Sequence, residues 1–221
     1  MDAQFRSAVI SMANSVPLLG RVLKHSRELD FWKMRKREEG RLGNAHYEHF
    51  YTTFFGIDRE FYRGKRILDV GCGPRGSLEW ADIAAERVGL DPLVPAYRKL
   101  GIDQHQMNYC AARAEHIPFA NSYFDVVASL NSLDHVDCVE RTIEEITRVT
   151  KPHGTFLLFV EVNHRVRACE PHCLPLDFVD SFVPAFTIKS SNLFGGAGNS
   201  SKAPYSGTGP GFLSAILNKN T

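Results

Sequence analysis

Short apolar runs alternate with polar stretches along the chain from about residue 63 onward. The run Arg66 to Val70 is apolar and β-branched and stops in a glycine-rich turn, which is typical of a buried strand. Similar runs predict four further strands over residues 84–90, 106–112, 124–130 and 155–162, of which 106–112 is the weaker prediction. Buried strands of a parallel sheet are nearly continuous in apolar residues, and these runs fit that pattern.

A helix is predicted between the last two of these strands. Residues 139–149 carry Ile143, Ile146 and Val149 at helical spacing, with charges on the other face. Residues 151–154, Lys-Pro-His-Gly, are expected to end it in a turn. Strands that alternate with helices predict a doubly wound, Rossmann-like α/β fold, with a parallel sheet covered by helices on both faces.

The C-terminal part of the chain has a different pattern. Two strand-like segments, residues 186–193 and 212–217, are joined by a stretch rich in Gly, Ser and Pro and without helical periodicity. Such a pair is expected to be antiparallel, because a parallel crossover needs a longer connection, usually helical. The sheet should therefore have about seven strands, the last pair antiparallel.

The N-terminal part, residues 1–62, has apolar and charged residues mixed at helical spacing. We therefore divide the chain into an N-terminal helical extension, 1–62, and a domain, 63–221. The extension and residues 169–183 are expected to form a lid over a pocket. The aromatic residues of the extension could line that pocket or dock its helices on the core, the second being favoured: Tyr47, Phe50, Tyr51, Phe54 and Phe55.

Ligands of open α/β sheets bind beyond the carboxyl ends of the strands. Gly71, Gly73 and Gly76 follow the first predicted strand, and Asp91 ends the second, about twenty residues later. Glycines let the backbone approach a ligand, and an acid at that distance accepts hydrogen bonds from ribose hydroxyls. The combination predicts a nucleoside ligand.

The glycines also satisfy the dinucleotide pattern G-x-G-x-x-G, so a nicotinamide dehydrogenase is an alternative. Three features argue against it. Asp69 stands where that pattern needs apolar packing, Pro74 removes a donor that would bind phosphate, and the chain has no Tyr-x-x-x-Lys pair.

Several motifs, in order along the chain, resemble those of a known protein family. Residues 67–73, Ile-Leu-Asp-Val-Gly-Cys-Gly, resemble the first motif of class I methyltransferases, and residues 90–92, Leu-Asp-Pro, resemble the second. Residues 114–119 and 122–127 resemble the third-strand loop and fourth strand of the ubiquinone-biosynthesis-like, type 11 branch, and residues 144–154 resemble its helix into strand five. The resemblance covers roughly residues 64 to 162.

This resemblance implies S-adenosylmethionine as the cofactor. The first acid and the glycine loop would hold its methionine part, the acid after the second strand its ribose, and the third-strand loop its adenine, with an asparagine near the sulfonium. The residues expected to contact the cofactor are Asp69, Gly71, Cys72, Gly73, Asp91, Pro92, Ala114, Glu115 and Asn131.

One departure supports a different function. The family usually has an acid at the position of Arg113, where it would bond the adenine amine. A non-catalytic S-adenosylmethionine-binding protein, regulatory or scaffolding, is therefore the alternative to a methyltransferase.

The expected acceptor is a small molecule, methylated on oxygen, nitrogen or carbon. His135 is the first candidate for a general base, although it could instead cap or pack the following helix; His172 is a second candidate. No metal is expected, because the histidines and cysteines that gather beyond the fifth strand match no standard zinc spacing: His164, Cys169, His172 and Cys173.

Composition narrows the class further. A net charge of +1 gives no footprint for nucleic acid, and no apolar run reaches the roughly 18 residues of a membrane span. The N-terminus is a poor signal peptide, and five scattered cysteines suggest reduced thiols, so we expect a cytoplasmic protein. The oligomeric state is not predicted.

Overall fold

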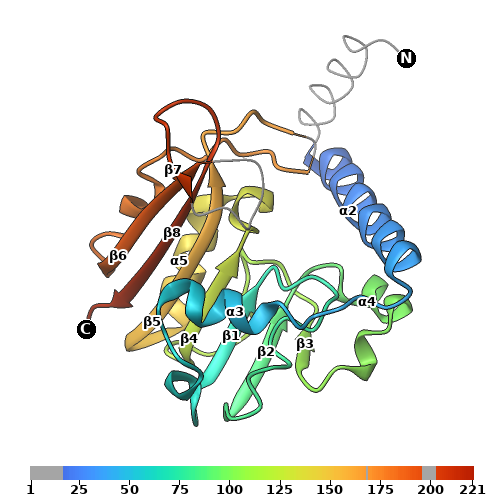
Figure 1. Cartoon of the computed structure of the whole chain (residues 1–221), viewed down its shortest axis with the longest axis horizontal. Helices are drawn as coiled ribbons and strands as arrows, with labels where there is room; N and C mark the ends of the chain where they lie inside the picture. Colours follow the sequence, from blue (N-terminus) through green and yellow to red (C-terminus); the bar gives the residue numbers. More distant parts are fainter. Residues whose placement is uncertain (1–16, 168, 196–202) are drawn as a thin grey trace.

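The computed structural model describes residues 17–167, 169–195 and 203–221. Its centre is one eight-stranded sheet in the order β3-β2-β1-β4-β5-β8-β6-β7 (Figure 1). Strands β1 to β5 are parallel to one another, whereas β8 is antiparallel to both of its neighbours, β5 and β6. The strands are β1 (Arg66–Val70), β2 (Glu86–Leu90), β3 (Asn108–Cys110), β4 (Phe124–Leu130), β5 (Thr150–Val162), β6 (Phe186–Gly195), β7 (Ala203–Pro204) and β8 (Gly211–Lys219).

This arrangement confirms the predicted Rossmann-like sheet and its antiparallel C-terminal pair. The expected linker between the last two strands contributes the two-residue strand β7, which pairs with the end of β6. Residues 196–202 of that linker and residues 1–16 of the predicted helical extension lie outside the described residues.

The helices are short, apart from two. They are α2 (Pro17–Glu39), α3 (Tyr47–Tyr51), α4 (Val94–Tyr97) and α5 (Val139–Val149). Short 3₁₀ helices cover Thr53–Phe55, Arg59–Tyr62, Arg98–Leu100, Ile102–Gln104, Leu133–His135 and Phe178–Phe182. Within the described residues, none of these helices is both long and apolar enough to cross a membrane.

Helix α5 has the bounds that its apolar periodicity predicts. It buries Ile146 and Val149 in the larger core cluster, together with Leu68 and Val70 of β1. The turn expected after the helix differs: residues 151–154 belong to the first part of β5. There His153 has a φ of +61°, and the β4–β5 register shifts, so the change of direction is made inside a strand.

The opposite face of the sheet is covered by the N-terminal region. Successive strand residues point to opposite faces, and Ile67 of β1 packs in a second core with Tyr51 and Tyr62. The stretch between Gly76 and Ala84 is short, which predicts an abbreviated helix, and the described connection between β1 and β2 has turns but no helix. Helix α3 and the 3₁₀ helix that ends at Tyr62 therefore cover this face (Figure 1).

Candidate functional site

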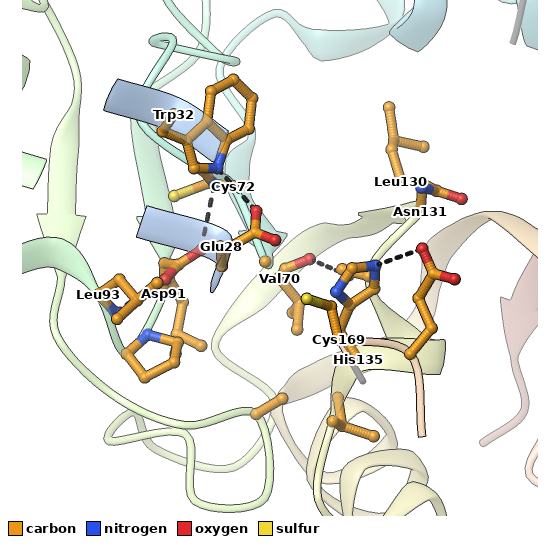
Figure 2. Close-up of a pocket in the computed structure, with 18 of the residues that line it drawn as sticks. Glu28, Trp32, Val70, Cys72, Asp91, Leu93, Leu130, Asn131, His135 and Cys169 are labelled. Atoms are coloured by element: carbon orange, nitrogen blue, oxygen red, sulfur yellow. Dashed lines mark hydrogen bonds and ion pairs between the residues drawn. The ribbon is translucent and has the colours of Figure 1, made fainter. Parts of the chain in front are cut away.

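A cavity of about 560 Å³ opens at the carboxyl ends of β1, β2 and β4 (Figure 2). Its volume lies in the range of small-molecule sites. Most of the residues predicted to contact a cofactor line it: Gly71, Cys72, Gly73, Asp91, Pro92, Ala114, Glu115 and Asn131. Asp69 is the exception and lies beneath the glycine loop.

The glycine loop after β1 needs residues without a side chain. Gly71 has a φ of +76° and Gly73 a φ of +58°, which only glycine adopts without strain. A Cβ atom at Gly71 would lie 2.3 Å from the Cβ of Ser132. Ser132 in turn donates a hydrogen bond to the Val70 carbonyl at 2.7 Å, which ties the loop after β4 to the end of β1.

Asp91 shapes the same loop from the end of β2. Its carboxylate accepts hydrogen bonds from the backbone of Gly73 at 3.2 Å and of Leu93 at 2.8 Å. The pKa of Asp91 is raised to about 7. Burial is the main cause, the two hydrogen bonds oppose it, and the nearby carboxylate of Glu28 adds to it. A carboxylate held at the cavity wall in this way can accept hydrogen bonds from a diol.

Asp69 supports the loop from below. Its carboxylate is buried and accepts hydrogen bonds from the hydroxyl groups of Ser77 and Tyr51. Burial raises the pKa of Asp69 to about 6. It can therefore act on a ligand through the loop that it supports.

The carboxylate of Glu115, which lines the cavity, already accepts hydrogen bonds from the backbone. One carboxylate oxygen accepts the backbone N–H of Asp137 at 2.6 Å and of Cys138 at 3.0 Å. Arg113, which stands where the family usually has an acid, pairs with Glu115 at 3.3 Å and with Asp137 at 3.0 Å. This pairing keeps the arginine charge compensated beside the cavity.

Asn131 directly follows β4 and lines the cavity. Its φ is +57°, and its backbone N–H donates to the Phe159 carbonyl of β5 at 2.6 Å. The side-chain oxygen of Asn131 is buried without a hydrogen-bond partner among the described residues. Such an unsatisfied acceptor fits a site that a polar ligand completes.

Helix α2 supplies a wall that sequence reasoning did not assign by residue. Trp32 lies against Gly73, 3.2 Å from where a Cβ atom would be, and donates to Glu28 at 2.7 Å (Figure 2). Arg75 of the glycine loop holds this helix through a bidentate pair with Glu39, at 2.6 and 2.7 Å. No local signal could have identified these residues, because their role depends on contacts far along the chain.

The aromatic residues of the N-terminal region divide between the two predicted roles. Tyr51 is buried in the core, whereas Tyr47, Phe50 and Phe54 line the cavity. Phe54 also packs edge-on against Phe159 of β5, with ring centroids 5.2 Å apart. We call the part of the cavity at the glycine loop and Asp91 its polar half, and the part lined by Tyr47, Phe50 and Phe54 its aromatic half.

The two candidate bases lie in different places. His135 lines the cavity, at the end of the 3₁₀ helix that follows β4. The ring of His172 bonds the Val136 carbonyl at 2.9 Å and lines a separate hollow beside α5. Of the second predicted lid segment, Cys169 and Glu170 line the cavity, whereas its later residues, among them Phe178, Val179 and Phe182, pack in the core.

Comparison with known proteins identifies the kind of domain that carries this cavity. Fold and cavity define the class of Rossmann-like, class I methyltransferases, and residues 68–158 match the family described as a methyltransferase domain. The chain is 33% identical over 94 residues to malonyl-[acyl-carrier protein] O-methyltransferase of Pseudescherichia vulneris, covering 42% of this chain and 37% of that protein. It is 38% identical over 88 residues to the ubiquinone/menaquinone biosynthesis C-methyltransferase UbiE of Ralstonia nicotianae, covering 39% and 33%.

A solved structure agrees with the fold. A putative S-adenosylmethionine dependent methyltransferase from Listeria monocytogenes superposes with a TM-score of 0.58 at 15% identity, over 80% of this chain and 100% of that one. Residues 68–158 thus resemble the methyltransferase domain of the type 11 branch of class I methyltransferases, whose cofactor is S-adenosylmethionine. The matched stretch spans about a third of the length of these curated relatives.

Proposed function

We propose that this protein transfers a methyl group from S-adenosylmethionine to a small-molecule acceptor with an apolar body. The observation that carries the proposal is a single cavity in which a glycine loop and a buried acid meet an aromatic wall. S-adenosylmethionine supplies the methyl group on a cationic sulfonium. The protein's own contribution is to hold donor and acceptor in line and to exclude water.

The polar half of the cavity suits the cofactor. Asp91 would accept hydrogen bonds from the ribose hydroxyls, and the backbone of residues 71–73 would hold the methionine part, supported by Asp69 below. Ala114 and Pro92 would pack against the nucleoside, with Glu115 beside the adenine. The unsatisfied oxygen of Asn131 would accept a hydrogen bond from the methionine ammonium group or approach the sulfonium.

The aromatic half suits the acceptor. Phe50, Phe54 and Phe159 surround it with apolar surface, and His135 lies at its edge. The similar proteins named above act, by their names, on a carrier-bound malonyl group and on ubiquinone or menaquinone precursors. These names indicate different acceptors, so we infer the apolar body of the acceptor from the aromatic lining of the cavity alone.

His135 is the proposed catalytic residue where the acceptor is a hydroxyl. A general base has to lie within hydrogen-bond reach of the proton that it removes. Of the two histidines predicted from the sequence, His135 is the one that lines the cavity, as His25 and His46 also do. His172 stays a prediction from the sequence, and its bond to the Val136 carbonyl favours a structural role.

The test is turnover. Purified protein is incubated with S-adenosylmethionine and a panel of phenols, quinols, fatty acids and amines, and formation of S-adenosylhomocysteine is followed. We expect turnover with at least one apolar acceptor, and a decrease of about 10²-fold or more in kcat for His135→Asn if that acceptor is a hydroxyl. Cofactor binding without turnover on any acceptor class would favour the regulatory or scaffolding alternative.

We also propose a cytoplasmic location. All five cysteines are free thiols in the structure, which is typical of a reducing compartment. A small-molecule acceptor, and not nucleic acid, remains the proposed partner, since the net charge is +1.

A further inference from the structure

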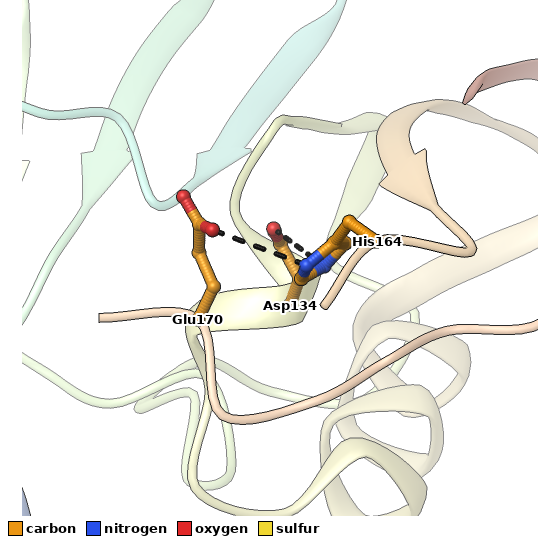
Figure 3. Close-up of side chains that lie close together, drawn as sticks. All are labelled: Asp134, His164 and Glu170. Carbon is orange, nitrogen blue, oxygen red and sulfur yellow. Dashed lines mark ion pairs between the residues drawn. The ribbon is translucent and has the colours of Figure 1, made fainter. Parts of the chain in front are cut away.

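Three side chains that bind metals in other proteins converge beside the cavity. Asp134 follows β4, His164 follows β5, and Glu170 comes from the loop that continues from β5 (Figure 3). One potential ligand atom from each lies within 4.8 Å of the others. His164 and Glu170 are six residues apart in one loop, whereas Asp134 lies 30 residues before His164, so the fold brings Asp134 to that loop.

The carboxylate of Asp134 is unusually placed. Its side chain is fully buried, and neither oxygen has a hydrogen-bond donor among the described residues. The Nε2 atom of His164, also buried, has no partner within that part of the chain and lies 3.6 Å from the nearer oxygen of Asp134. Burying a carboxylate without hydrogen-bond donors is unfavourable, so this placement calls for a ligand that compensates it.

The orientation of His164 sharpens this observation. Its Nδ1 atom lies 2.9 Å from the Arg165 carbonyl, and a carbonyl can only accept, so Nδ1 carries the hydrogen. The other ring nitrogen, Nε2, is left to face the carboxylate of Asp134, while the carboxylate of Glu170 lies 4.0 Å from Nδ1. A bond from Nδ1–H to a backbone carbonyl is how proteins orient a metal-binding histidine.

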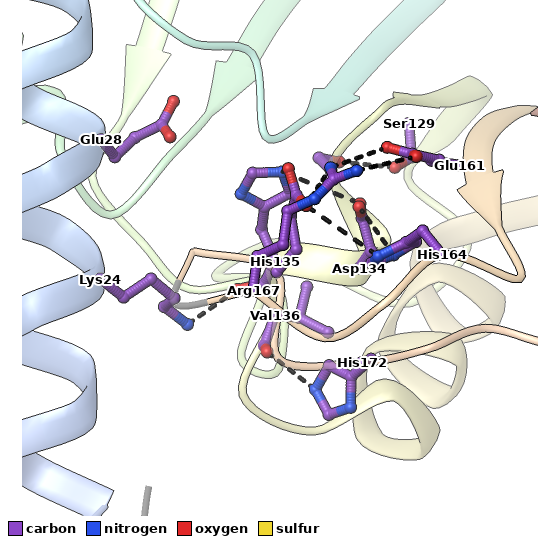
Figure 4. A network of polar contacts seen from close by, with 12 residues as sticks. Lys24, Glu28, Ser129, Asp134, His135, Val136, Glu161, His164, Arg167 and His172 are labelled. Carbon is purple, nitrogen blue, oxygen red and sulfur yellow. Dashed lines mark hydrogen bonds and ion pairs between the residues drawn. The ribbon is translucent and has the colours of Figure 1, made fainter. Parts of the chain in front are cut away.

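The surroundings keep the cluster negative. Arg167 pairs with Glu170 at 2.5 Å but also with Glu161 at 3.1 Å, so one positive charge is shared by two carboxylates (Figure 4). Asp134 receives no arginine or lysine among the described ion pairs. Its nearest basic groups are imidazoles, with His135 Nε2 3.9 Å from its second oxygen.

We propose that Asp134, His164 and Glu170 bind a divalent transition-metal cation, such as Zn²⁺ or Mn²⁺. Two carboxylates and one imidazole are ligands that these ions accept, and three protein ligands leave a position open. Glu170 and His135 also line the cavity, so the open position would face the acceptor side. The inference rests on this geometry and not on the proposed function.

This proposal departs from the sequence expectation of no metal. The sequence grouped His164 with cysteines of its own loop, whereas its closest charged partner in space is an aspartate 30 residues earlier. Spacing rules for zinc motifs cannot detect ligands supplied by two different strand ends.

The experiment measures metal binding directly, without cofactor or acceptor. Untagged, chelator-treated protein is titrated with ZnCl₂ by calorimetry and with MnCl₂ by electron paramagnetic resonance, and its metal content as purified is measured. Asp134→Asn and His164→Gln test the ligands, and Glu170→Gln provides a variant at the cavity edge. His153→Asn is the matched control, since His153 is exposed and asparagine tolerates its positive φ.

We expect one equivalent of Zn²⁺ or Mn²⁺ on the wild type and on His153→Asn, and a loss of affinity on the order of tenfold or more in each ligand variant that keeps its circular-dichroism spectrum. The absence of stoichiometric binding to folded wild type would overturn the proposal, as would wild-type affinity in both Glu170→Gln and Asp134→Asn.

Discussion

Asp91 combines the two properties that a ribose-binding acid needs in this fold, hydrogen bonds that fix it and a position at the cavity wall. Its burial raises its pKa to about 7, with the carboxylates of Glu28 and Asp69 adding to the shift. The free protein therefore carries Asp91 partly protonated near neutral pH. Only the ionised form can accept hydrogen bonds from both hydroxyl groups of a ribose.

We therefore predict that affinity for S-adenosylhomocysteine rises with pH through about 7. Between about pH 6 and pH 8 the Kd should fall by about tenfold, because the ionised fraction of Asp91 rises by roughly that factor. Asp91→Asn should bind weakly with a flat profile. A wild-type Kd that does not change over this range would contradict the role of Asp91.

Asp69 makes a second pH prediction, this time for stability. Its pKa is raised from 3.8 to about 6 by burial, so the folded protein binds its proton more tightly than the unfolded chain does. The unfolding free energy should then fall as pH rises from about 4 to about 6, by up to about 3 kcal/mol. Asp69→Asn should reduce the slope measured in urea titrations by this amount and leave the contribution of Asp91, and an unchanged slope in the variant would refute the assignment.

Gly71 tests the loop itself. Gly71→Ala would add a Cβ atom 2.3 Å from Ser132 at a φ of +76°, whereas Gly56→Ala has a φ of +70° and open space. The control isolates the cost of the backbone conformation, about 1–2 kcal/mol. Gly71→Ala should cost about 1–3 kcal/mol more, and Ser132→Gly in the same chain should recover part of it. Equal unfolding free energies for the two alanine variants would show that the contact with Ser132 is unimportant.

At the scale of elements, helix α2 is the part that completes the cavity. It reaches the glycine loop through Trp32 and Glu28 and is held by the Arg75–Glu39 pair and by Lys24, which pairs with Asp137. Both anchors join the helix to loops at the carboxyl edge of the sheet. The helix therefore packs over the site while adding little to the sheet core.

Trp32→Ala should weaken binding of S-adenosylhomocysteine on the order of tenfold while leaving the fold intact, since it removes the aromatic surface that faces Gly73. Met34→Ala, an exposed position on the same helix, is the control. Calorimetric Kd values for the two variants give the comparison. Wild-type affinity in Trp32→Ala would mean that α2 is not part of the cofactor site.

The elements also show how far the sequence could be used for prediction. Helix α5 and strands β1 and β4 have the predicted bounds, because their apolar spacing and flanking turns are local signals. The proximity of Trp32 to Gly73 and of His164 to Asp134 had no such signal, since it depends on which strand ends meet at one edge. Likewise, the short β1–β2 connection predicted an abbreviated helix, but not that Tyr51 and Tyr62 would cover the sheet there.

At the scale of the whole molecule, one sheet edge gathers the glycine loop, the acid after β2, the asparagine after β4 and an aromatic wall into one cavity. The N-terminal region belongs to the same structure, covering one sheet face with α3 and the cavity with α2. A ligand in the cavity therefore contacts both parts of the chain. Binding should stabilise the whole fold, by about 2.7 kcal/mol at a ligand concentration one hundred times the Kd.

The most direct test of the central claim is calorimetric titration of the purified protein with S-adenosylmethionine and S-adenosylhomocysteine, with NAD and the Asp91→Ala variant as controls. We predict one site with a Kd on the order of micromolar for both sulfur compounds, lost in the variant and absent with NAD. A folded protein that binds neither sulfur compound would contradict the account and leave only the fold established.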